Sequence, residues 1–394
     1  MTFPRRQAAI AGVYLTEQGK LPDRSSFSLQ LEAIKGALDD AGMTVADIDG
    51  LAPMSGSNHI GGLDGGTAPH QFWAEQLGRR PLSLMEVGGA SGQLAKAAAA
   101  ISAGMCECAV LFYGRAGSRT GPGGTVTPDR APRVAEWSFP IHGAYMIPFY
   151  AMWAQRYMHE FKITGEDLAQ VAVVDRHHAT LNPDSIMGRR GEITVDDVLG
   201  SRMIASPLHL LDCSLDNDGG YAVVITTAER ARDARKAPVY VLGGAEAFYT
   251  DFYVSFDDTW FPEGGLAVRQ ATDRAFALAG VGRADVDVLA IYDCFTITGI
   301  RNLEEMGFCG VGEGADFVRE GNTRLGGKLP TNTDGGLLSN SHCGDPSGLQ
   351  VVEVVRQLRG ECGARQVPDA TIGASLQQGF AVHGMGSTLI MAVD

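Results

Sequence analysis

A tight glycine-containing turn between a short apolar stretch and an alanine-rich helix most constrains how this chain folds. Residues 82–87 have the composition of a short strand, residues 93–103 have a helical pattern, and the apolar run 109–113 is expected to be a further strand. The turn that joins the first strand to the helix reads Val87-Gly88-Gly89-Ala90-Ser91-Gly92. Strand, turn, helix and strand in this order are typical of a sheet covered by helices, so we predict an α/β protein.

The same alternation of strands and helices is expected twice along the chain. Before the turn, a strand is predicted at 8–14, a helix at 28–41, and a turn and strand at 45–54. After residue 235 we predict strands at 239–243, 288–292, 371–375 and 388–393, and helices at 266–279, 296–306 and 349–358. The repeated order favours an internal duplication, with an N-terminal half of residues 1–236 and a C-terminal half of residues 237–394.

An insertion in the first half, at about residues 115–210, is expected to cap the active site. Residues 114–140 are rich in Gly, Pro and Arg, which predicts a loop. Helices are predicted at 150–161 and 165–180, the second with Thr164 as its N-cap. A strand at 221–226 then returns the chain to the first half.

Composition excludes several classes of function. The chain has 394 residues, of which 45% are hydrophobic and 20% charged, and its formal net charge is −14. This length suits two fused domains, and the acidic balance argues against general binding of nucleic acid or of an anionic membrane surface. No apolar run has the length of a membrane span or of a signal-peptide core. Seven cysteines lack zinc-ligand spacing. We therefore predict a cytoplasmic protein with reduced cysteines and no metal or permanently bound cofactor.

The turn resembles the nucleophile elbow of the thiolase superfamily. In that family a cysteine in a Cys-x-Ser-Gly-like turn lies at a helix N-terminus, where the helix dipole favours its thiolate. Ser91 and Gly92 match this pattern, and Gly89 stands where the cysteine would be. The resemblance therefore implies a thiolase scaffold that does not form an acyl-enzyme.

Four further segments resemble the sterol-carrier-protein-type thiolases, in order and at the expected spacing. Ile291-Tyr292-Asp293-Cys294-Phe295 is similar to their His-Asp-Cys-Phe loop, with Tyr292 in place of the histidine. Residues 332–342 resemble the Asn-x-x-Gly-Gly-x-x-x-x-Gly-His loop and place His342 on the catalytic histidine. Val382-His383-Gly384-Met385-Gly386 resembles the glycine-rich C-terminal loop. Residues 211–213 with 218–220 resemble the segment that enters the last strand of the first half.

Taken together, these motifs are most similar to the steroid side-chain-cleaving aldolases within the superfamily. The resemblance implies a five-layered αβαβα fold, a homodimer, and retro-aldol cleavage of a β-hydroxyacyl-CoA to a ketone and a shorter acyl-CoA. Coenzyme A would enter as part of the substrate. A small partner protein with an oligonucleotide-binding (OB-like) fold and a zinc ribbon is also implied. This chain departs from the aldolases at His342, where they have a tyrosine, and Cys343 replaces the proline that normally follows the histidine.

The resemblance also assigns the candidate site residues. His342 suits the base because a neutral histidine accepts a proton near neutral pH, and Tyr292 suits the acid, with the reverse assignment as the alternative. His383 is a third catalytic candidate, as a base, a substrate donor or a packed side chain. Backbone N–H groups near 89–91 and 384–386 are expected to stabilise an oxyanion. The predicted substrate-binding residues are Gly89, Ala90, Ser91, Cys294, Asn332, Gly384 and Gly386.

Two other functions stay open on the sequence. A thiolase-type acyltransferase would need Cys294 or Cys343 as its nucleophile, although buried inert thiols are expected at both positions. A non-catalytic thiolase-like subunit of a larger complex would tolerate glycine at the elbow. Two polar pairs, His177-His178 and Arg189-Arg190, are predicted to be solvated, with contact to the phosphates of coenzyme A as the alternative for the arginines. Residues 216–218 are expected to form a turn.

Overall fold

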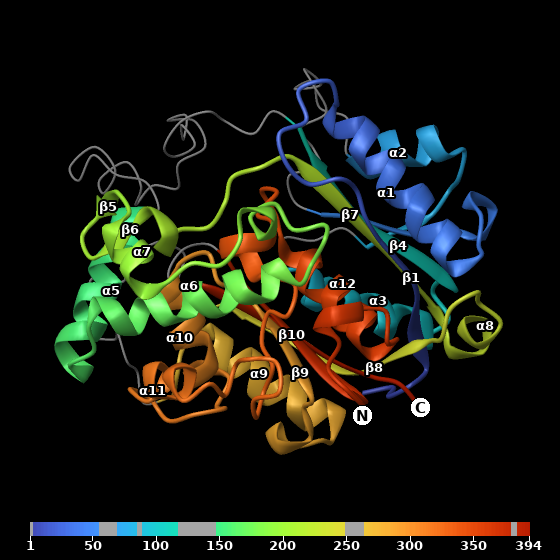
Figure 1. Cartoon of the computed structure of the whole chain (residues 1–394). Helices are drawn as coiled ribbons and strands as arrows, with labels where there is room; N and C mark the ends of the chain where they lie inside the picture. The colour runs from blue at the N-terminus through green and yellow to red at the C-terminus, as the bar shows by residue number, and fades with distance from the viewer. Residues whose placement is uncertain (1–2, 55–68, 85–88, 117–146, 249–263, 380–383) are drawn as a thin grey trace, which may run out of the picture.

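A nine-stranded β-sheet runs through the molecule in the order β3-β2-β4-β7-β1-β8-β11-β10-β9 (Figure 1). The structure is a computed structural model that describes residues 3–54, 69–84, 89–116, 147–248, 264–379 and 384–394. The strands of this sheet are β1 (Ala8–Leu15), β2 (Gly50–Pro53), β3 (Leu82–Ser83), β4 (Cys108–Arg115), β7 (Gly219–Thr227), β8 (Val239–Phe248), β9 (Val288–Ile291), β10 (Ile372–Gly379) and β11 (Met385–Ala392). Two residue pairs join β1 to β8, so the sheet divides into two halves at this narrow junction.

Both halves of the sheet have the same strand order and the same strand directions. In the first half β2 is parallel to β3 and β4, and β7 is antiparallel to β4 and β1. In the second half β9 is parallel to β10, and β11 is antiparallel to β10 and β8. Thr331 bridges Leu289 of β9 in parallel, at the place that β3 takes in the first half. The prediction of two similar halves is confirmed, while the boundary at residues 236 and 237 stays a prediction.

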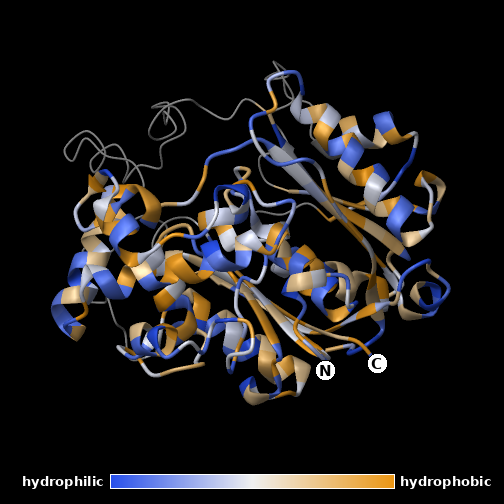
Figure 2. Cartoon of the chain, viewed as in Figure 1, coloured by the Kyte–Doolittle hydropathy of each residue, from blue (hydrophilic) through white to orange (hydrophobic). Residues whose placement is uncertain are grey.

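Helices form three layers around the two halves of the sheet, which gives the predicted five-layered αβαβα arrangement (Figure 1). The helices α1 (Ser26–Ala41) and α2 (Pro69–Leu77) pack on the first half, and α9 (Ala267–Ala279) packs on β8 and β11. Between the halves lie α3 (Ala90–Ser102) and α12 (Ser347–Leu358), each of which contacts strands of both. Most of α3 is buried, as expected for an alanine-rich helix enclosed on both sides. Figure 2 shows the matching hydropathy, with hydrophobic residues concentrated along the strands.

The insertion between β4 and β7 forms a helical cap over the second half. Its described elements are α5 (Ile147–Phe161), α6 (Gly165–Thr180), α7 (Val195–Gly200), and the strand pair β5 (Met203–Ala205) and β6 (Leu208–His209). The predicted start of α6 is confirmed, because the backbone N–H of Thr164 donates to Asp167 Oδ2 at 2.8 Å. Packed against α6 are α10 (Thr296–Glu305), α11 (Gly314–Arg319) and a π-helical turn, Gly336–Asn340. The short helix α8 (Ala228–Arg232) leads into β8.

The sequence did not predict α2 or α11. In the described part of the chain, no helix combines the length and the apolar character needed to cross a bilayer.

Candidate active site

The two predicted catalytic side chains, Tyr292 and His342, lie in contact. The Tyr292 hydroxyl is 3.4 Å from His342 Nε2, and the two rings meet edge to face with their centroids 6.1 Å apart. This separation is longer than an ordinary hydrogen bond, so the interaction between the two side chains is a weak one. The sequence motifs selected two residues that are 50 positions apart in the chain, and the structure places these two side chains next to each other.

Tyr292 follows β9 directly, at the carboxyl end of a strand that is parallel to its neighbour β10. Its carbonyl oxygen accepts a hydrogen bond of 2.7 Å from Asn302 Nδ2, and α10 begins four residues later. The side chain is 9% exposed. The carboxyl ends of parallel strands are where open α/β sheets place their sites, so this position fits a catalytic role.

A compact loop presents His342. The loop has glycine at two consecutive positions because Gly335 (φ 105°) and Gly336 (φ 59°) both adopt left-handed backbone conformations, which other residues rarely do. A Cβ on Gly335 would lie 2.6 Å from the Ala179 Cβ, and a Cβ on Gly336 would meet the Asp293 carboxylate. The loop therefore packs tightly between α6 and the Tyr292 segment.

The segment 216–218 holds the end of this loop, and the turn predicted for these residues is wrong, because Asp218 forms a β-bridge with Gly19. Asn217 Oδ1 accepts the backbone N–H of His342 at 2.8 Å, and Asn217 Nδ2 donates to Ser341 Oγ at 3.0 Å. Arg115, at the end of β4, pairs with Asp216 and donates to the Asn217 carbonyl oxygen at 3.2 Å. No local pattern indicates these contacts, because they join segments more than 100 residues apart.

The surroundings of His342 keep its imidazole neutral. The ring retains partial exposure, but burial lowers its pKa from 6.5 to about 4, and the positive charge of Arg115 acts in the same direction. A neutral imidazole can accept a proton at Nε2, so the predicted role of base is available near neutral pH.

The elbow is filled by side chains of the second half. A Cβ on Gly89 would meet Ser387 Oγ and would lie 3.0 Å from the Gln377 Cβ. The backbone N–H of Ala90 donates to Ser347 Oγ at 3.1 Å, and that of Ser91 donates to Gln377 Oε1 at 2.8 Å. Both amides have buried acceptors in this structure, and their predicted role as oxyanion donors stays a prediction.

Other predicted substrate-binding residues have structural contacts. Asn332 is buried, and its Oδ1 accepts the backbone N–H of Ile291 at 2.8 Å. Gly386 belongs to β11, and a Cβ there would lie 2.6 Å from the Val268 Cα, so it allows α9 to pack closely. Gly384 is buried just before β11. Their contact with substrate stays a prediction. His383 lies outside the described residues, as do Val87 and Gly88 of the elbow.

None of the seven cysteines is an activated nucleophile. Burial raises the pKa of Cys294 and of Cys343 to about 12, far from the lowered values of reactive thiols. The pKa of each of the other five is raised for the same reason, namely Cys106, Cys108, Cys213, Cys309 and Cys362. Hydrogen bonds with Thr298, Tyr150 and Tyr292 oppose this effect at Cys294. The cysteine therefore lies beside Tyr292 but stays a thiol.

His178 corrects another expectation. It was predicted to be solvated, but its side chain is fully buried between α6 and the loop before His342. Its Nε2 accepts the backbone N–H of Leu325 at 3.2 Å, and its Nδ1 lies 3.2 Å from the Asn332 carbonyl oxygen, so the proton resides on Nδ1. Its neighbour His177 is exposed and contacts Glu192, as predicted for a polar face.

We expect this histidine to make the protein less stable in mild acid. Burial lowers the pKa of His178 from 6.5 to about 4, so between these pH values the unfolded chain binds a proton that the native protein does not bind. Its stabilising contribution is complete above pH 6.5, and about 3 kcal/mol of it is lost as the pH falls toward 4. Chemical denaturation between pH 7 and 4 should show a flatter slope for His178→Gln than for wild type. Equal slopes would contradict the prediction, and His177→Gln is the exposed control.

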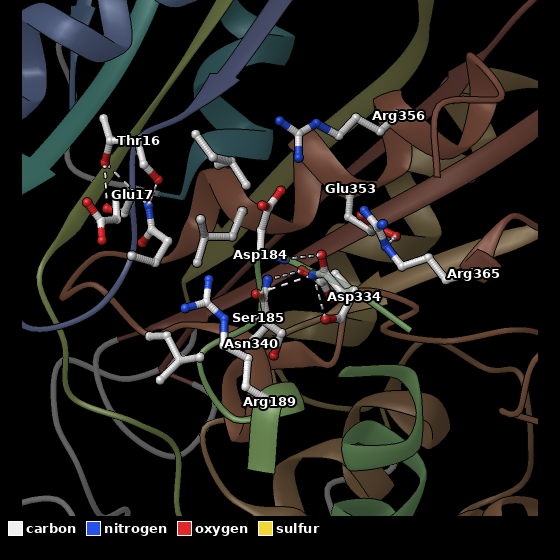
Figure 3. Close-up of a pocket in the computed structure, with 15 residues that line it drawn as sticks. Thr16, Glu17, Asp184, Ser185, Arg189, Asp334, Asn340, Glu353, Arg356 and Arg365 are labelled. Carbon is white, nitrogen blue, oxygen red and sulfur yellow. Dashed lines mark hydrogen bonds and ion pairs between the residues drawn. The ribbon is translucent and has the colours of Figure 1, made fainter. Parts of the chain in front are cut away.

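A separate cavity of about 400 Å³ lies behind the His342 loop (Figure 3). The cavity is lined by residues 15–18, by the segment 182–189 that follows α6, by Asp334 and Asn340 of the His342 loop, and by α12 together with Arg365. The side chains of Arg189 and Asp184 line it together with Arg356. Neither Tyr292 nor His342 lines this cavity, so it is distinct from the catalytic pair. Contact of Arg189 with a phosphate of coenzyme A stays a prediction. Within the described ranges, no group of three or more His, Cys, Asp or Glu side chains is placed to hold a metal ion.

Comparison with known proteins places this geometry in a family. Residues 263–392 match the family model described as Thiolase C-terminal domain-like. A steroid side-chain-cleaving aldolase of Thermomonospora curvata is 37% identical to this chain, over 90% of both sequences. The chain belongs to the thiolase superfamily. A 17-hydroxy-3-oxo-4-pregnene-20-carboxyl-CoA lyase of Mycobacterium tuberculosis is 36% identical, over 90% of this chain and 92% of the lyase.

A solved structure supports the same placement in the thiolase superfamily. The Ltp2-ChsH2(DUF35) aldolase superimposes with a TM-score of 0.85 at 33% identity, covering 100% of this chain and 99% of that one. The resemblance inferred from the five motifs is thus confirmed, and with it the thiolase fold.

Proposed function

We propose that this protein is a carbon–carbon lyase that cleaves a β-hydroxyacyl-CoA by a retro-aldol reaction, releasing a ketone and a shorter acyl-CoA. The observation that carries the proposal is the elbow, where Gly89 provides no nucleophile and Ser387 occupies the space of one. The names of both relatives, an aldolase and a carboxyl-CoA lyase, support the same reaction class and a steroid-derived substrate.

The Tyr292–His342 pair can supply every proton transfer of this reaction. His342 Nε2 takes the proton of the β-hydroxyl, and the O–H electron pair forms the ketone carbonyl as the Cα–Cβ bond breaks. The electrons of that bond pass to Cα and the thioester carbonyl, giving an enolate. Tyr292 donates its hydroxyl proton to Cα. The imidazolium then returns its proton to the Tyr292 oxygen, 3.4 Å away, which restores the starting state.

Arg115 has the charge to assist this sequence. Its guanidinium acts electrostatically on His342, so it would also favour the negative charge that develops on the enolate oxygen. In the described structure Arg115 donates to the Asn217 carbonyl oxygen, and the Asn217 side chain in turn orients His342 by accepting its backbone N–H. We infer a supporting role for Arg115 beside the two catalytic groups.

The two alternative functions have less support. An acyltransferase needs a thiolate, and burial keeps both candidate thiols, Cys294 and Cys343, protonated. A non-catalytic subunit has no need of an acid and a base in contact, whereas Tyr292 and His342 meet.

Coenzyme A is expected as part of the substrate, in line with the acyl-CoA named for the lyase. A protein partner is also part of the proposal, because the name of the similar Ltp2-ChsH2(DUF35) aldolase joins two components. The partner's OB-like fold and zinc ribbon, the homodimer and the cytoplasmic location stay predictions of the sequence. Light scattering of the purified protein at micromolar concentration tests the dimer, and a monomer would contradict it.

A substrate panel tests the proposed function. The protein is incubated with β-hydroxyacyl-CoA thioesters that carry steroid, alicyclic or aromatic groups, and mass spectrometry follows the ketone and the shortened acyl-CoA. We expect both products in equal amounts and no acyl group on the protein. An acyl adduct on a cysteine during turnover would instead establish the acyltransferase.

Restoring a cysteine at the elbow should not create a thiolase. We expect Gly89→Cys to leave lyase activity no higher than in wild type and to destabilise the protein by about 1–3 kcal/mol, because the new side chain meets Ser387 and Gln377. Adding Ser387→Ala should recover part of this loss by removing the obstructing oxygen. Chemical denaturation and a lyase assay measure both effects. A more active or more stable single variant would contradict this account of the elbow.

A further inference from the structure

Two buried carboxyl groups meet behind the catalytic pair. Asp175 on α6 is 4% exposed, Asp293 beside Tyr292 is fully buried, and their side chains are in hydrogen-bond contact. Two carboxylates in contact away from water cannot both be ionised, so at least one of them holds a proton.

The hydrogen bonds identify which carboxyl group is ionised. The backbone N–H of Leu337 donates to Asp293 Oδ1 at 2.9 Å and to Oδ2 at 3.1 Å, and that of Leu338 donates to Oδ2 at 3.3 Å. Asp293 therefore acts as an acceptor through both oxygens, as an ionised carboxylate does. Asp175 Oδ2 has no hydrogen-bond partner among the described residues. The shared proton is thus on Asp175, which donates it to Asp293.

This pair connects both catalytic segments. Asp293 directly follows Tyr292, and the amides that it accepts belong to the π-helical turn Gly336–Asn340, which ends two residues before His342. The left-handed Gly336 allows the carboxylate to approach the turn this closely. Movement of the Asp293 carboxylate would therefore displace Tyr292 and the His342 loop relative to each other.

We propose that Asp175 and Asp293 form a one-proton carboxyl pair that positions the His342 loop against Tyr292. Asp175 is the proton holder, and Asp293 is the anion that caps the turn. Both are positioning residues, since they act through the catalytic groups. Their importance for turnover rests on the proposed lyase function, whereas proton sharing does not.

A small cavity beside Asp175 completes the arrangement. It has a volume of about 20 Å³, enough for one water molecule, and is lined by Asp175 and Thr323 among mostly apolar side chains. Thr323 Oγ1, like Asp175 Oδ2, has no partner among the described residues, and both residues are 4% exposed.

Neighbouring charges reinforce the single proton. Burial and the adjacent Asp293 raise the pKa of Asp175 well above its usual value, and the negative charge of Asp334 acts in the same direction. Burial also raises the pKa of Asp293 to about 6, against the lowering effect of its backbone hydrogen bonds. The other ionisable groups on the elements packed around the pair include Glu166, Asp167, Arg176, His177, His178, Tyr292, Cys294, Arg301, Glu304, Glu305, Asp316, Arg319, His342 and Glu353.

Proton sharing predicts a particular dependence of stability on pH. The native protein keeps the Asp175 proton at pH values where the unfolded chain has lost it, so the stability contributed by this group is complete below about pH 4. It is lost as the pH rises through that value toward the raised native pKa of Asp175. Asp175→Asn needs no proton, because its amide always donates to Asp293. Its melting temperature, compared with that of wild type, should therefore rise as the pH increases from 4 to 8.

Infrared spectroscopy tests the shared proton directly. At pH 8, where the buried Asp334 with its pKa raised to about 7 is mostly ionised, the wild-type protein should show the C=O band of a buried protonated carboxyl group, shifted in heavy water, and Asp175→Asn should lose most of it. The exposed Asp196→Asn is the control and should keep both the band and the wild-type melting profile. Absence of the band in wild type would overturn the proposal, and this measurement requires no variant to fold.

Kinetics test the positioning role. We expect Asp175→Asn to keep kcat at pH 7 within about threefold of wild type, because the hydrogen bond to Asp293 is preserved. Asp293→Asn cannot accept both backbone amides through two oxygens, so its kcat should fall about 10²-fold with KM unchanged. Equal losses in the two variants, or a normal kcat in Asp293→Asn, would overturn the positioning role. If neither wild type nor any variant turns over β-hydroxyacyl-CoA, the proposed lyase function fails, and the infrared band still decides proton sharing.

Discussion

Replacing His342 by alanine or Tyr292 by phenylalanine is expected to lower kcat by about 10²–10⁴-fold. The phenylalanine keeps the packed ring and removes only the proton donor. His342 lies on a loop with partial exposure, so its truncation leaves no large core cavity. The circular dichroism spectrum and the melting temperature should therefore change little in either variant. Turnover at saturating β-hydroxyacyl-CoA is the measurement.

The double variant separates a pair from two independent groups. Because the two side chains are in contact and pass one proton, the double variant should be scarcely slower than the poorer single variant. The half-buried Tyr14, packed against α1, and the exposed His177 give the matched controls Tyr14→Phe and His177→Ala, which should keep wild-type kcat. The acid limb of kcat/KM should lie near pH 4 to 5, because the pKa of His342 is lowered to about 4. Near-normal turnover in a single variant would remove that residue from the mechanism and direct attention to His383.

The layered fold could be predicted because its signals are local. Alternating apolar runs mark strands, and α6 was predicted over its full observed range because Thr164 and Asp167 define its start. The alanine-rich α3 was predicted at 93–103 and is observed at Ala90–Ser102. By contrast, α2 and α11 are short and lack such signals, and they form through tertiary contacts.

The catalytic pair could be predicted from motif register, but the residues that support it could not. Asn217 contacts the His342 loop, Arg115 contacts Asn217, and Asp175 contacts Asp293. These contacts join segments distant in sequence, and no spacing or periodicity shows them. The hydrogen bonds of the Ala90 and Ser91 amides could not be predicted for the same reason, because their acceptors lie on the other half of the protein. Motif register predicts which residues are candidates for the chemistry, and long-range packing determines how they are held.

A buried charge cluster supports the active site from the cap. Arg301 on α10 is fully buried, and it pairs with Glu304 and, at 2.6 Å, with Glu305. Its guanidinium lies over the rings of Trp153 and Tyr157 on α5, at 5.8 and 5.7 Å from the ring centroids. The Tyr157 hydroxyl also donates to Glu304. The cluster therefore joins the cap to the helix that follows Tyr292.

Removing this arginine should destabilise the protein more than any other single change considered for the fold. Arg301→Met leaves Glu304 and Glu305 buried without a cation, and we expect the free energy of unfolding to fall by about 3–5 kcal/mol. The triple variant Arg301→Met, Glu304→Gln, Glu305→Gln removes the uncompensated charges and should recover much of this loss. Chemical denaturation measures both.

An exposed ion pair is the matched control for this prediction. Lys35 and Asp39 are four residues apart on the outer helix α1, and their side chains are 77% and 58% exposed. Lys35→Met should leave the free energy of unfolding nearly unchanged, because water already solvates both charges. Arg301→Met should also slow turnover, since α5 and α10 lose the cluster that joins them next to Tyr292. A stability within about 1 kcal/mol of wild type, which is what single surface changes usually give, would show that the cluster does not hold the cap on the catalytic half.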